Sequence, residues 1–588
     1  MQRYPQTEPT NSTAENPKSQ ALRDFLVGAA LFIATAAIVL WQNAHLTVLW
    51  DLSYILDSAY RISIGQVPYR DLPFAHAPLT FLIQAAIIHL TGRVYFHHVL
   101  YAAIAGGLGS VLAWRIILRT FSAISTQAWL RSMLLAAPLI VLGIYSILPN
   151  PSYDCDCILS ILLAIFLLQR VEPKTMDNAP MLRPILTGAA LVLPPFFKQN
   201  IGLPFLLITL AAIITLLLAN IIYPTRTHTS TKTWLYVLTG AGTTLLAAAV
   251  LIYFTVGLHH YIYWTVQFAA QRRLPGLSDM LSIYNEPSLR WTIPCIAIAM
   301  LLLRTRLVRN LWARSLALAL LSAPFLWTIA SLFLSTDSDD RASSLLALWP
   351  LLLILAIAHT LYELRRGPTL RTLLPVILLA TIHGTMLSQQ LWGSTYAIWP
   401  LLLILIAGMV ASIANINIPG TQSLATALTT IIAATLLLCG GLYMASEERL
   451  SYTKLFDGPL VHATLPPLKG MAVRGPYLPA FEQLVRFAAD EIPPNDAILL
   501  IPGEDPFYFT TGRIPQFPIL LFDKATDPYS PQQIASLVRT RNVRWLIVKR
   551  NLQINEDATP QREATLEFLR AEFILYRQLD GYDIYRSR

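Results

Sequence analysis

The sequence predicts a polytopic α-helical membrane protein with about 13 transmembrane helices, a juxtamembrane helix on the outer surface and a small C-terminal α/β domain. Three observations predict this class. The 588 residues are 55% hydrophobic and only 13% charged, whereas soluble domains carry roughly a quarter charged residues. Apolar stretches near the length of a bilayer-crossing helix recur from residue 25 to residue 445. After Met444 the composition becomes polar, and short β-rich runs alternate with amphipathic helical stretches.

The net charge of +9 does not indicate a nucleic-acid-binding protein. The basic residues occur singly or in small groups between apolar spans, which is typical of membrane anchoring rather than of a basic groove. We therefore expect membrane lipid as a partner and no nucleic acid. Only four cysteines occur, and Cys295 and Cys439 fall inside apolar spans, so no disulfide scaffold is predicted.

Composition divides the chain into three expected regions. Residues 1–23, rich in Pro, Gln, Thr, Asn and Ser, predict a disordered cytoplasmic tail. Residues 24–445 form the transmembrane region, whose first helix near 25–41 is retained because no small-residue cleavage site follows it. Residues 446–588 form an extracytoplasmic α/β domain. The further spans are expected near 97–117, 132–148, 155–169, 184–197, 201–222, 234–256, 291–303, 315–335, 343–362, 372–390, 397–413 and 424–445.

Within the α/β domain, sequence patterns predict individual elements. Phe481 to Ala488 has the apolar spacing of a helix, and Ser-Pro and Thr-Pro pairs at 530–531 and 559–560 open two more. Four short runs are expected to be strands: 497–501, 543–548, 573–576 and 582–585.

The short apolar stretch 78–91 decides the topology. If it lies on the outer surface or dips into it, the basic clusters at 115–131, 304–314 and 365–371 face the cytoplasm, as the positive-inside rule requires. If it spans the membrane, those clusters fall outside. We therefore predict a cytoplasmic N-terminus and an outward C-terminal domain, and most acidic residues of the membrane region then also face outward.

The first outward loop, residues 42–96, carries Asp51, Asp57 and Asp71. Asp51 follows the first helix closely and is expected at the membrane surface, where a charge is costly unless it is paired or used. Its alternative role is to place a negative charge at the N-terminus of a surface helix. Asp57 can pair with Arg61 four residues later, so it is left out of the predicted site.

The stretch WDLSYILDSAYRISIGQVPYRDLPFAHAPL, residues 50–79, resembles the opening loop of the C-type (GT-C) glycosyltransferase superfamily. The resemblance is to the bacterial branch related to dolichyl-phosphate-mannose:protein mannosyltransferases and aminoarabinose transferases. In that branch an acidic residue is followed by an amphipathic juxtamembrane helix, a Gly-x-x-x-Tyr-x-Asp element and a Pro-Leu pair. The matching positions are Asp51, the helix around Ser53 to Ile64, Gly65, Tyr69, Asp71, Pro78 and Leu79.

The resemblance has departures and weaker extensions. Leu52 stands where many relatives have Glu, and His76, separated by Ala77, replaces the basic or polar residue before the Pro-Leu pair. Residues 150–154 are similar to the family's second outer loop, and residues 197–200 to the outer end of a later helix. The resemblance is therefore specific over residues 50–79 and loose over most of the remaining chain.

The resemblance implies a glycosyltransferase of the bacterial inner membrane that acts in the cell envelope. Its donor would be a polyprenyl-phosphate-linked hexose or pentose, and its acceptor a hydroxyl or amine of a glycan, lipid or protein on the periplasmic face. Such a transfer needs a base for the acceptor and cations for the leaving phosphate, and no general acid because phosphate leaves readily. A single displacement opposite the phosphate inverts the anomeric centre.

Outward-facing polar residues supply the candidates for this chemistry. Asp51 is the expected base, followed by Asp154, which is alternatively a helix N-cap, and Asp71. Cations that face outward are candidates for the donor phosphate and alternatively anchor lipid head groups. The donor-phosphate candidates are Lys198, Arg272, Arg273 and Arg341, and Tyr69 and His76 are expected to support the loop or the acceptor.

No metal site is predicted, and two rival functions are left open. On a helix, the side chains of residues 154–157 point in different directions, and so do those of the adjacent histidines 97–98 and 259–260. None of these three groups therefore makes a ready metal chelate. A divalent ion bridging Asp51 and the donor phosphate is the one metal left open. A flippase or transporter of lipid-linked sugars would show repeated halves or ionisable residues deep inside its spans. In this sequence His383 is the main residue of that kind. The other rival is a scaffold whose soluble domain binds a partner.

Overall fold

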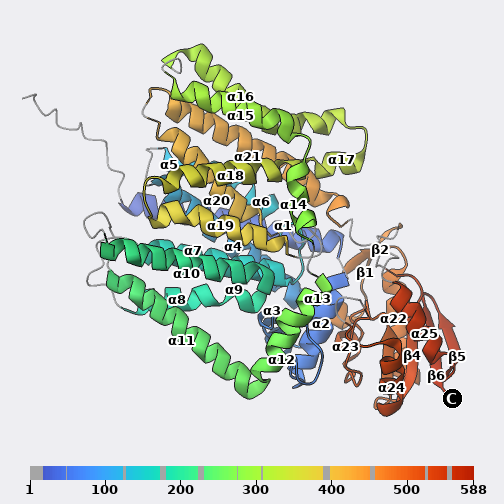
Figure 1. The fold of residues 1–588 in the computed structure, drawn as a ribbon. Coiled ribbons are helices and arrows are strands. Elements are labelled where there is room, and N and C mark those ends of the chain that lie inside the picture. The colour runs from blue at the N-terminus through green and yellow to red at the C-terminus, as the bar shows by residue number, and fades with distance from the viewer. Residues whose placement is uncertain are drawn as a thin grey trace, which may run out of the picture.

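The chain folds into a helical bundle followed by a small α/β domain (Figure 1). Every span predicted from the sequence overlaps a helix, although residues 143–148 of the span predicted at 132–148 are not helical and residues 388–390 lie outside the described part of the chain. Among the described residues, seven helices are long and apolar enough to cross a membrane, and a pair bent by 64° before Leu289 makes an eighth. The computed structural model describes residues 17–47, 50–122, 127–171, 181–222, 231–273, 276–305, 309–387, 397–416, 418–450, 457–522, 527–552 and 559–588.

The helices of the bundle follow one another along the chain, with long connections after α1 and after α11. The first begins at Pro17, ahead of the boundary predicted at residue 24, because Pro is favoured in a first helical turn. The bundle helices are α1 (Pro17–His45), α4 (Tyr95–Ser122), α5 (Ala128–Ala136), α6 (Leu139–Leu142), α7 (Tyr153–Val171), α8 (Leu182–Val192), α9 (Pro194–Phe197), α10 (Gln199–Ile222), α11 (Thr231–Thr255), α15 (Leu289–Arg304), α16 (Leu311–Leu334), α18 (Leu348–Leu364), α19 (Leu370–Thr385), α20 (Trp399–Ala414) and α21 (Thr421–Ala445).

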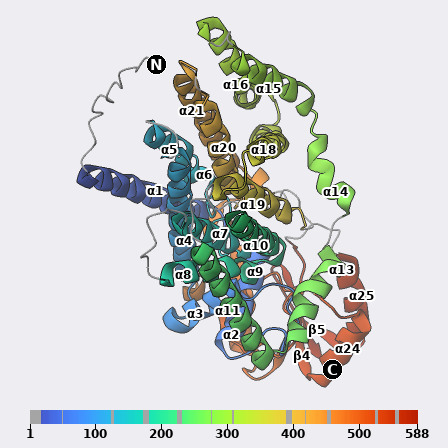
Figure 2. The same ribbon diagram turned by 60° about the vertical axis from the view of Figure 1, so that its left-hand side comes forward.

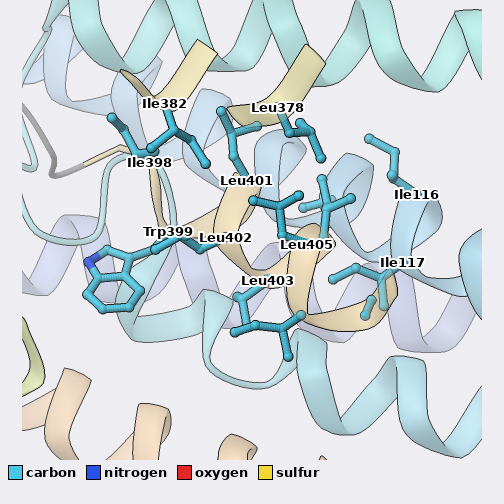
Figure 3. Packing of buried hydrophobic residues seen from close by; sticks show 14 of the residues in the cluster. Ile116, Ile117, Leu378, Ile382, Ile398, Trp399, Leu401, Leu402, Leu403 and Leu405 are labelled. Atoms are coloured by element: carbon cyan, nitrogen blue, oxygen red, sulfur yellow. The ribbon is translucent and has the colours of Figure 1, made fainter. Parts of the chain in front are cut away.

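Helix α20 forms the centre of the bundle. Its residues are apolar on all sides, as expected of a helix without a solvent face. Figure 3 shows Leu405 of α20 near Ile116 and Ile117 of α4, with Leu378 of α19 alongside. At one end of α20 the ring of Trp399 lies 5.0 Å from that of Trp349 on α18.

Shorter elements connect the bundle helices at one end. Two belong to the first loop, and neither is long enough to be counted among the spans. The amphipathic stretch predicted around residues 53–64 lies in the first of them. These elements are α2 (Trp50–Ser63), α3 (Leu79–Thr91), α12 (Leu258–Ile262), the π-helix η2 (Tyr263–Phe268), α13 (Ala269–Arg273), α14 (Leu277–Leu281), η3 (Ser282–Asn285), α17 (Ser338–Ser343) and η5 (Ser344–Ala347).

The C-terminal domain contains a four-stranded sheet in the order β3-β4-β6-β5. Strands β3 and β4 are parallel, and β6 is antiparallel to both β4 and β5. The predicted strands and helices are confirmed, whereas the hairpin β1-β2 and helix α23 were not predicted. The elements are β1 (Leu460–His462), β2 (Ala472–Arg474), α22 (Tyr477–Glu491), β3 (Ala497–Ile501), α23 (Phe507–Thr511), α24 (Pro531–Thr540), β4 (Val543–Lys549), α25 (Thr559–Leu569), β5 (Phe573–Leu579) and β6 (Tyr582–Ser587), with turns η6 (Glu448–Leu450) and η7 (Pro466–Leu468).

Helices cover both faces of this sheet. Ile498 and Trp545 belong to one apolar cluster with residues of α22, and Leu499 and Leu546 belong to another with residues of α24. This division follows the alternation of side chains along a strand. The cluster under α22 also contains Leu52 and other residues of α2, so α2 packs on the C-terminal domain as well as on the bundle.

A buried group of charges closes the carboxyl ends of β3 and β4. The ammonium group of Lys549 lies 2.7 Å from Asp505 and 3.0 Å from Glu504, and Tyr477 and Tyr582 donate hydrogen bonds to Asp505. Although burial lowers the pKa of Lys549, the two carboxylates raise it above its ordinary value. The turn after β3 is therefore tied to β4 and β6.

Replacing Lys549 by Met is expected to destabilise the domain by about 3–5 kcal/mol, because two buried carboxylates lose their cation. The matched control is Arg550→Met, which removes the exposed neighbour that pairs with Asp583 and is expected to cost less than about 1 kcal/mol. Thermal unfolding of the detergent-solubilised chain, followed by tryptophan fluorescence, measures both. Equal losses in the two variants would contradict a structural role for the buried group.

Candidate functional site

A lysine and a carboxylate, predicted separately from the sequence, meet at one end of the bundle. The carboxylate of Asp154, in the first turn of α7, pairs with the ammonium group of Lys198, which lies between α9 and α10. The same ammonium group lies 4.8 Å from the ring centre of Tyr153. Both charged side chains are nearly buried, at 12% and 11% exposure. Burial at this depth strengthens the attraction between unlike charges.

Close packing of α19 against α10 fixes the backbone next to Lys198. The side chain of Asn200 donates a 3.1 Å hydrogen bond to the carbonyl of Gly384. A Cβ atom at Gly384 would lie 2.4 Å from the carbonyl oxygen of Asn200, so only glycine permits this approach. Gly202 is similarly confined, since its Cβ atom would lie 2.2 Å from the nitrogen of Pro195.

The first loop covers this pair with aromatic side chains. The ring of His76 lies 4.9 Å from that of Tyr153 and 5.4 Å from that of Tyr54 on α2. The hydroxyl of Tyr69 donates a 2.6 Å hydrogen bond to the carbonyl of His76, and burial raises the pKa of this phenol. Tyr69 has a left-handed φ of 67°, a strained conformation that surrounding contacts must hold. Tyr69 and His76 thus shape the loop over the lysine–carboxylate pair.

Asp51 lies in the first turn of α2. The structure describes its backbone and not its side chain. Tyr54 follows one helical turn later and is linked to Tyr153 through the ring of His76. The backbone of Asp51 is therefore at the edge of the same aromatic group.

The segment from α12 to α13 lies against the first loop. Gln199 donates one hydrogen bond to the carbonyl of Ala75 in the loop, at 3.2 Å, and another to the carbonyl of Thr265 in η2, at 2.9 Å. The ring of Tyr261 lies 5.2 Å from that of Tyr69. This arrangement places α2, α3, α9, α12 and α13 together in Figure 1. Gln199 thus joins the two segments, a role that the resemblance of residues 197–200 did not predict.

The basic candidates Arg272 and Arg273 are the last residues of α13, and their side chains lie outside the described part of the structure. Arg341 lies in α17, where its guanidinium group donates to the carbonyls of Ser335 at 2.7 Å and Thr336 at 3.3 Å. Arg341 therefore binds carbonyl groups beyond the end of α16, and Figure 1 shows α17 well apart from α2 and α9. The contacts give it no shared partner with Lys198.

Asp71 lies in an exposed turn. It accepts hydrogen bonds from Arg70 and, at 2.8 Å, from the backbone nitrogen of Val67. The hydrogen bond from Arg70 lowers the pKa of Asp71 below its usual range. Gly65 before it has a φ of 97°, so the Gly-x-x-x-Tyr-x-Asp element forms a compact turn after α2.

Asp156 is a buried carboxylate beside the site. It accepts hydrogen bonds from Thr80, Tyr101 and Tyr145 at 2.6–2.7 Å. These three hydroxyl groups come from α3, α4 and the segment after α6, and they satisfy most of its acceptor capacity. Asp156 therefore ties the first loop to the bundle, whereas Asp154 two residues earlier faces Lys198.

The C-terminal domain is attached to α2 by polar contacts, which the sequence did not predict. Asp57 does not form the expected ion pair with Arg61. Its carboxylate accepts hydrogen bonds from the backbone nitrogens of Tyr508 and Phe509, at 3.3 and 2.7 Å. Arg61 donates to the backbone carbonyls of residues 517 and 518, at 3.0 and 2.9 Å. These partners lie more than 400 positions along the chain, where no local pattern could indicate them.

Removing the carboxylate of Asp57 is expected to change the pH dependence of stability. Burial raises the pKa of Asp57 to about 8 from 3.8, against the opposing effect of the two backbone amides. The fold therefore favours the protonated acid, and its stability contribution is full at low pH and falls as pH rises from about 4 to about 8. Relative to Asp57→Asn, the wild type should lose up to about 1.4 kcal/mol per pH unit in that range.

Thermal unfolding in detergent between pH 5 and pH 8 measures this difference. Asp71→Asn is the matched control, because Asp71 is exposed and its lowered pKa keeps it ionised throughout the range. Parallel stability curves for the wild type and Asp57→Asn would refute the titration of Asp57.

The described residues contain no group of three or more His, Cys, Asp or Glu side chains arranged to hold a metal ion. His383, the deep ionisable residue noted in the sequence, lies at the end of α19 and shares a 2.6 Å hydrogen bond with Tyr284. Among the described residues, Lys198 is the cation at this end of the bundle that pairs with a predicted catalytic residue, Asp154.

Fold and site define the class: the chain is a polytopic α-helical membrane protein with a C-terminal α/β domain, and a buried lysine–carboxylate pair lies at one end of its bundle. The structure is similar to that of ArnT from Cupriavidus metallidurans, solved with undecaprenyl phosphate, at 12% identity over 97% of this chain and 98% of that one, with a TM-score of 0.43. It is also similar to the oligosaccharyltransferase AglB from Archaeoglobus fulgidus, solved with an inhibitory peptide and a dolichol-phosphate, at 11% identity over 95% of this chain and 74% of that one, with a TM-score of 0.48.

Identity and TM-scores are too low to transfer the activity of either protein to this chain. No protein-family model matches the sequence, and no curated protein matches it.

Proposed function

We propose that this chain is a GT-C-type membrane glycosyltransferase that moves a sugar from a polyprenyl-phosphate donor to an acceptor hydroxyl or amine. The observation that carries the proposal is the pairing of Lys198 with Asp154 beneath the aromatic side chains of the first loop. A nearly buried ammonium group at the end of an apolar bundle is costly unless it meets an anion. The resemblance of residues 50–79 to the family's opening loop supports the same class.

A comparison of Lys198 with the buried Lys549 shows why Lys198 suits a ligand. Lys549 contacts two carboxylates, so its charge is more than balanced within the protein. Lys198 contacts one carboxylate among the described residues and lies near the face of Tyr153. An ammonium group has three donors, so Lys198 retains capacity for a phosphate oxygen. We assign Lys198 to the donor phosphate and Asp154 to positioning Lys198.

Asp51 is the proposed base. It removes the proton from the acceptor O–H or N–H while the acceptor atom attacks the anomeric carbon of the sugar. The bond from that carbon to the phosphate oxygen breaks, and its electrons leave with the polyprenyl phosphate. Attack from the side opposite the phosphate inverts the anomeric centre. Arg272 and Arg273 on α13 are the proposed further contacts of the phosphate, because η2 before them is joined to Gln199 beside Lys198.

The remaining candidates have supporting roles in this proposal. Tyr69 and His76 hold the loop over the site, and Asp71 holds the turn that follows α2. The stretch 503–508 braces α2, because Phe507 and Tyr508 are buried and the backbone of Tyr508 is bonded to Asp57. Arg341 is left outside the site.

The proposed location is the bacterial inner membrane. The positive-inside rule places the basic clusters in the cytoplasm, so the site and residues 446–588 face the periplasm. A polyprenyl chain then lies in the bilayer with its phosphate at the surface, near the ends of α7 and α10.

The test is transfer of radiolabelled sugar from a panel of polyprenyl-phosphate sugars to native membrane acceptors. Asp51→Asn is expected to lower kcat by about 10²–10⁴-fold with little change in the KM for the donor, because it removes general base catalysis. Lys198→Met is expected to act mainly by raising the donor KM. Asp154→Asn should raise the donor KM less, since the Asn oxygen still accepts a hydrogen bond from Lys198, as expected of a positioning residue.

Asp279→Asn is the matched control, because Asp279 is an exposed carboxylate in α14 outside the proposed machinery. It should transfer at the wild-type rate. Full transfer by Asp51→Asn would remove Asp51 as the base. No transfer from any donor by the wild type, together with translocation of lipid-linked sugar in liposomes, would overturn the transferase in favour of a flippase.

A further inference from the structure

A cleft of about 730 Å³ lies between the α15–α16 pair and helices α18, α20 and α21. Figure 2 shows this pair beside the other three helices at the edge of the bundle. The cleft is within the range of about 300–1,000 Å³ that ligand pockets occupy. Most of its wall is apolar, including Leu301, Phe325, Leu355, Met409 and Ile432.

One end of the cleft is basic. Arg304 ends α15 and Arg366 follows α18, and both line the cleft. The two guanidinium groups lie over the ring of Tyr362, at 5.5 and 5.2 Å from its centre. Arg366 also pairs with Glu363 at 3.1 Å, whereas Arg304 has no ion pair among the described residues. The two cations thus have one paired carboxylate among the described residues, which leaves a net positive charge at this end of the cleft.

The basic end of the cleft is at the far end of the bundle from Lys198. Helix α18 ends just before Arg366, and α19 then runs back so that Gly384 meets Asn200 beside Lys198. The basic end of the cleft is therefore on the side that the positive-inside rule assigns to the cytoplasm. A ligand there occupies a place separate from the proposed donor site and does not depend on the proposed function.

The chemistry of the cleft fits a phospholipid. An apolar space between membrane helices, with two arginines at one end, suits acyl chains whose head group lies at the arginines. Guanidinium groups bind phosphate oxygens in a forked geometry, and basic pockets between helices on the cytoplasmic side bind anionic head groups. Sugar or nucleotide ligands would leave the long apolar wall unmatched.

We propose that the cleft between α15–α16 and α18–α20–α21 binds one anionic glycerophospholipid, with its phosphate on Arg304 and Arg366. The acyl chains fill the space along Leu301, Leu355 and Met409. The lipid then adds contacts between the α15–α16 pair and the rest of the bundle, on which α16 already packs through α21. Its binding to the folded chain stabilises the fold in proportion to occupancy.

Native mass spectrometry of the detergent-purified full chain tests this with phosphatidylglycerol and phosphatidylcholine of equal chain length. The wild type is expected to bind the first phosphatidylglycerol molecule about tenfold more tightly than phosphatidylcholine, because each Arg near the head group adds attraction. Arg304→Gln with Arg366→Gln should abolish this preference. Arg309→Gln with Arg365→Gln, which removes two charges from exposed residues that do not line the cleft, should preserve it.

A third variant tests the apolar wall. Ala358 lines the cleft and is exposed to it, so Ala358→Phe should fill part of the space and lower lipid occupancy severalfold. Phosphatidylglycerol should raise the unfolding temperature of the wild type but not that of the Arg304 and Arg366 double variant. Equal preference in the two double variants, no preference in the wild type, or full occupancy in Ala358→Phe would each overturn the proposal.

Discussion

The hydrogen bonds of Asp57 and Arg61 to the C-terminal domain are the interaction on which the arrangement of the site depends. Both side chains are buried, and buried polar groups must be satisfied. Their partners are backbone groups of the domain, so helix α2 cannot shift without breaking them. On its other side, Tyr54 of α2 packs on His76 over the site. The domain thereby sets the position of the turn that carries Asp51.

Buried charges occur in both halves of the chain with different degrees of neutralisation. The group around Lys549 is closed, since two carboxylates and two tyrosine hydroxyls complete it. Such a group specifies how β3, β4 and β6 meet more than it adds to stability. The pair of Lys198 and Asp154 is open by comparison, because the lysine contacts one carboxylate among the described residues. The same residue types thus form a closed structural group in one place and the proposed donor-binding pair in the other.

Local patterns predicted much of the fold. Hydropathy located the bundle helices, and the Ser-Pro pair located α24, whose Ser530 forms the expected cap with Gln533. Hydropathy could not show which helices touch, because every bundle helix is apolar. It missed α23, which is only five residues long and is held by Asp57 from a distant part of the chain.

The site was predictable as a set of candidates and not as a geometry. Asp154 and Lys198 were each selected by their position next to an apolar stretch, and the fold brings them together. Arg341 satisfied the same criterion, yet it binds backbone carbonyls near the end of α16. The contact of α10 with α19 at Gly384 depends on the absence of a single carbon atom. Spacing along the sequence contains no information about such distances.

The order of strands in the C-terminal sheet has a consequence for biogenesis. Strand β6 is the last described element along the chain, yet it lies between β4 and β5 in the interior of the sheet. Its first residue, Tyr582, also donates a hydrogen bond to Asp505 in the turn before α23. The interior of the sheet therefore cannot be completed until β6 has emerged from the ribosome. The bundle helices can insert during translation, whereas the domain that holds α2 closes its sheet only after they have been made.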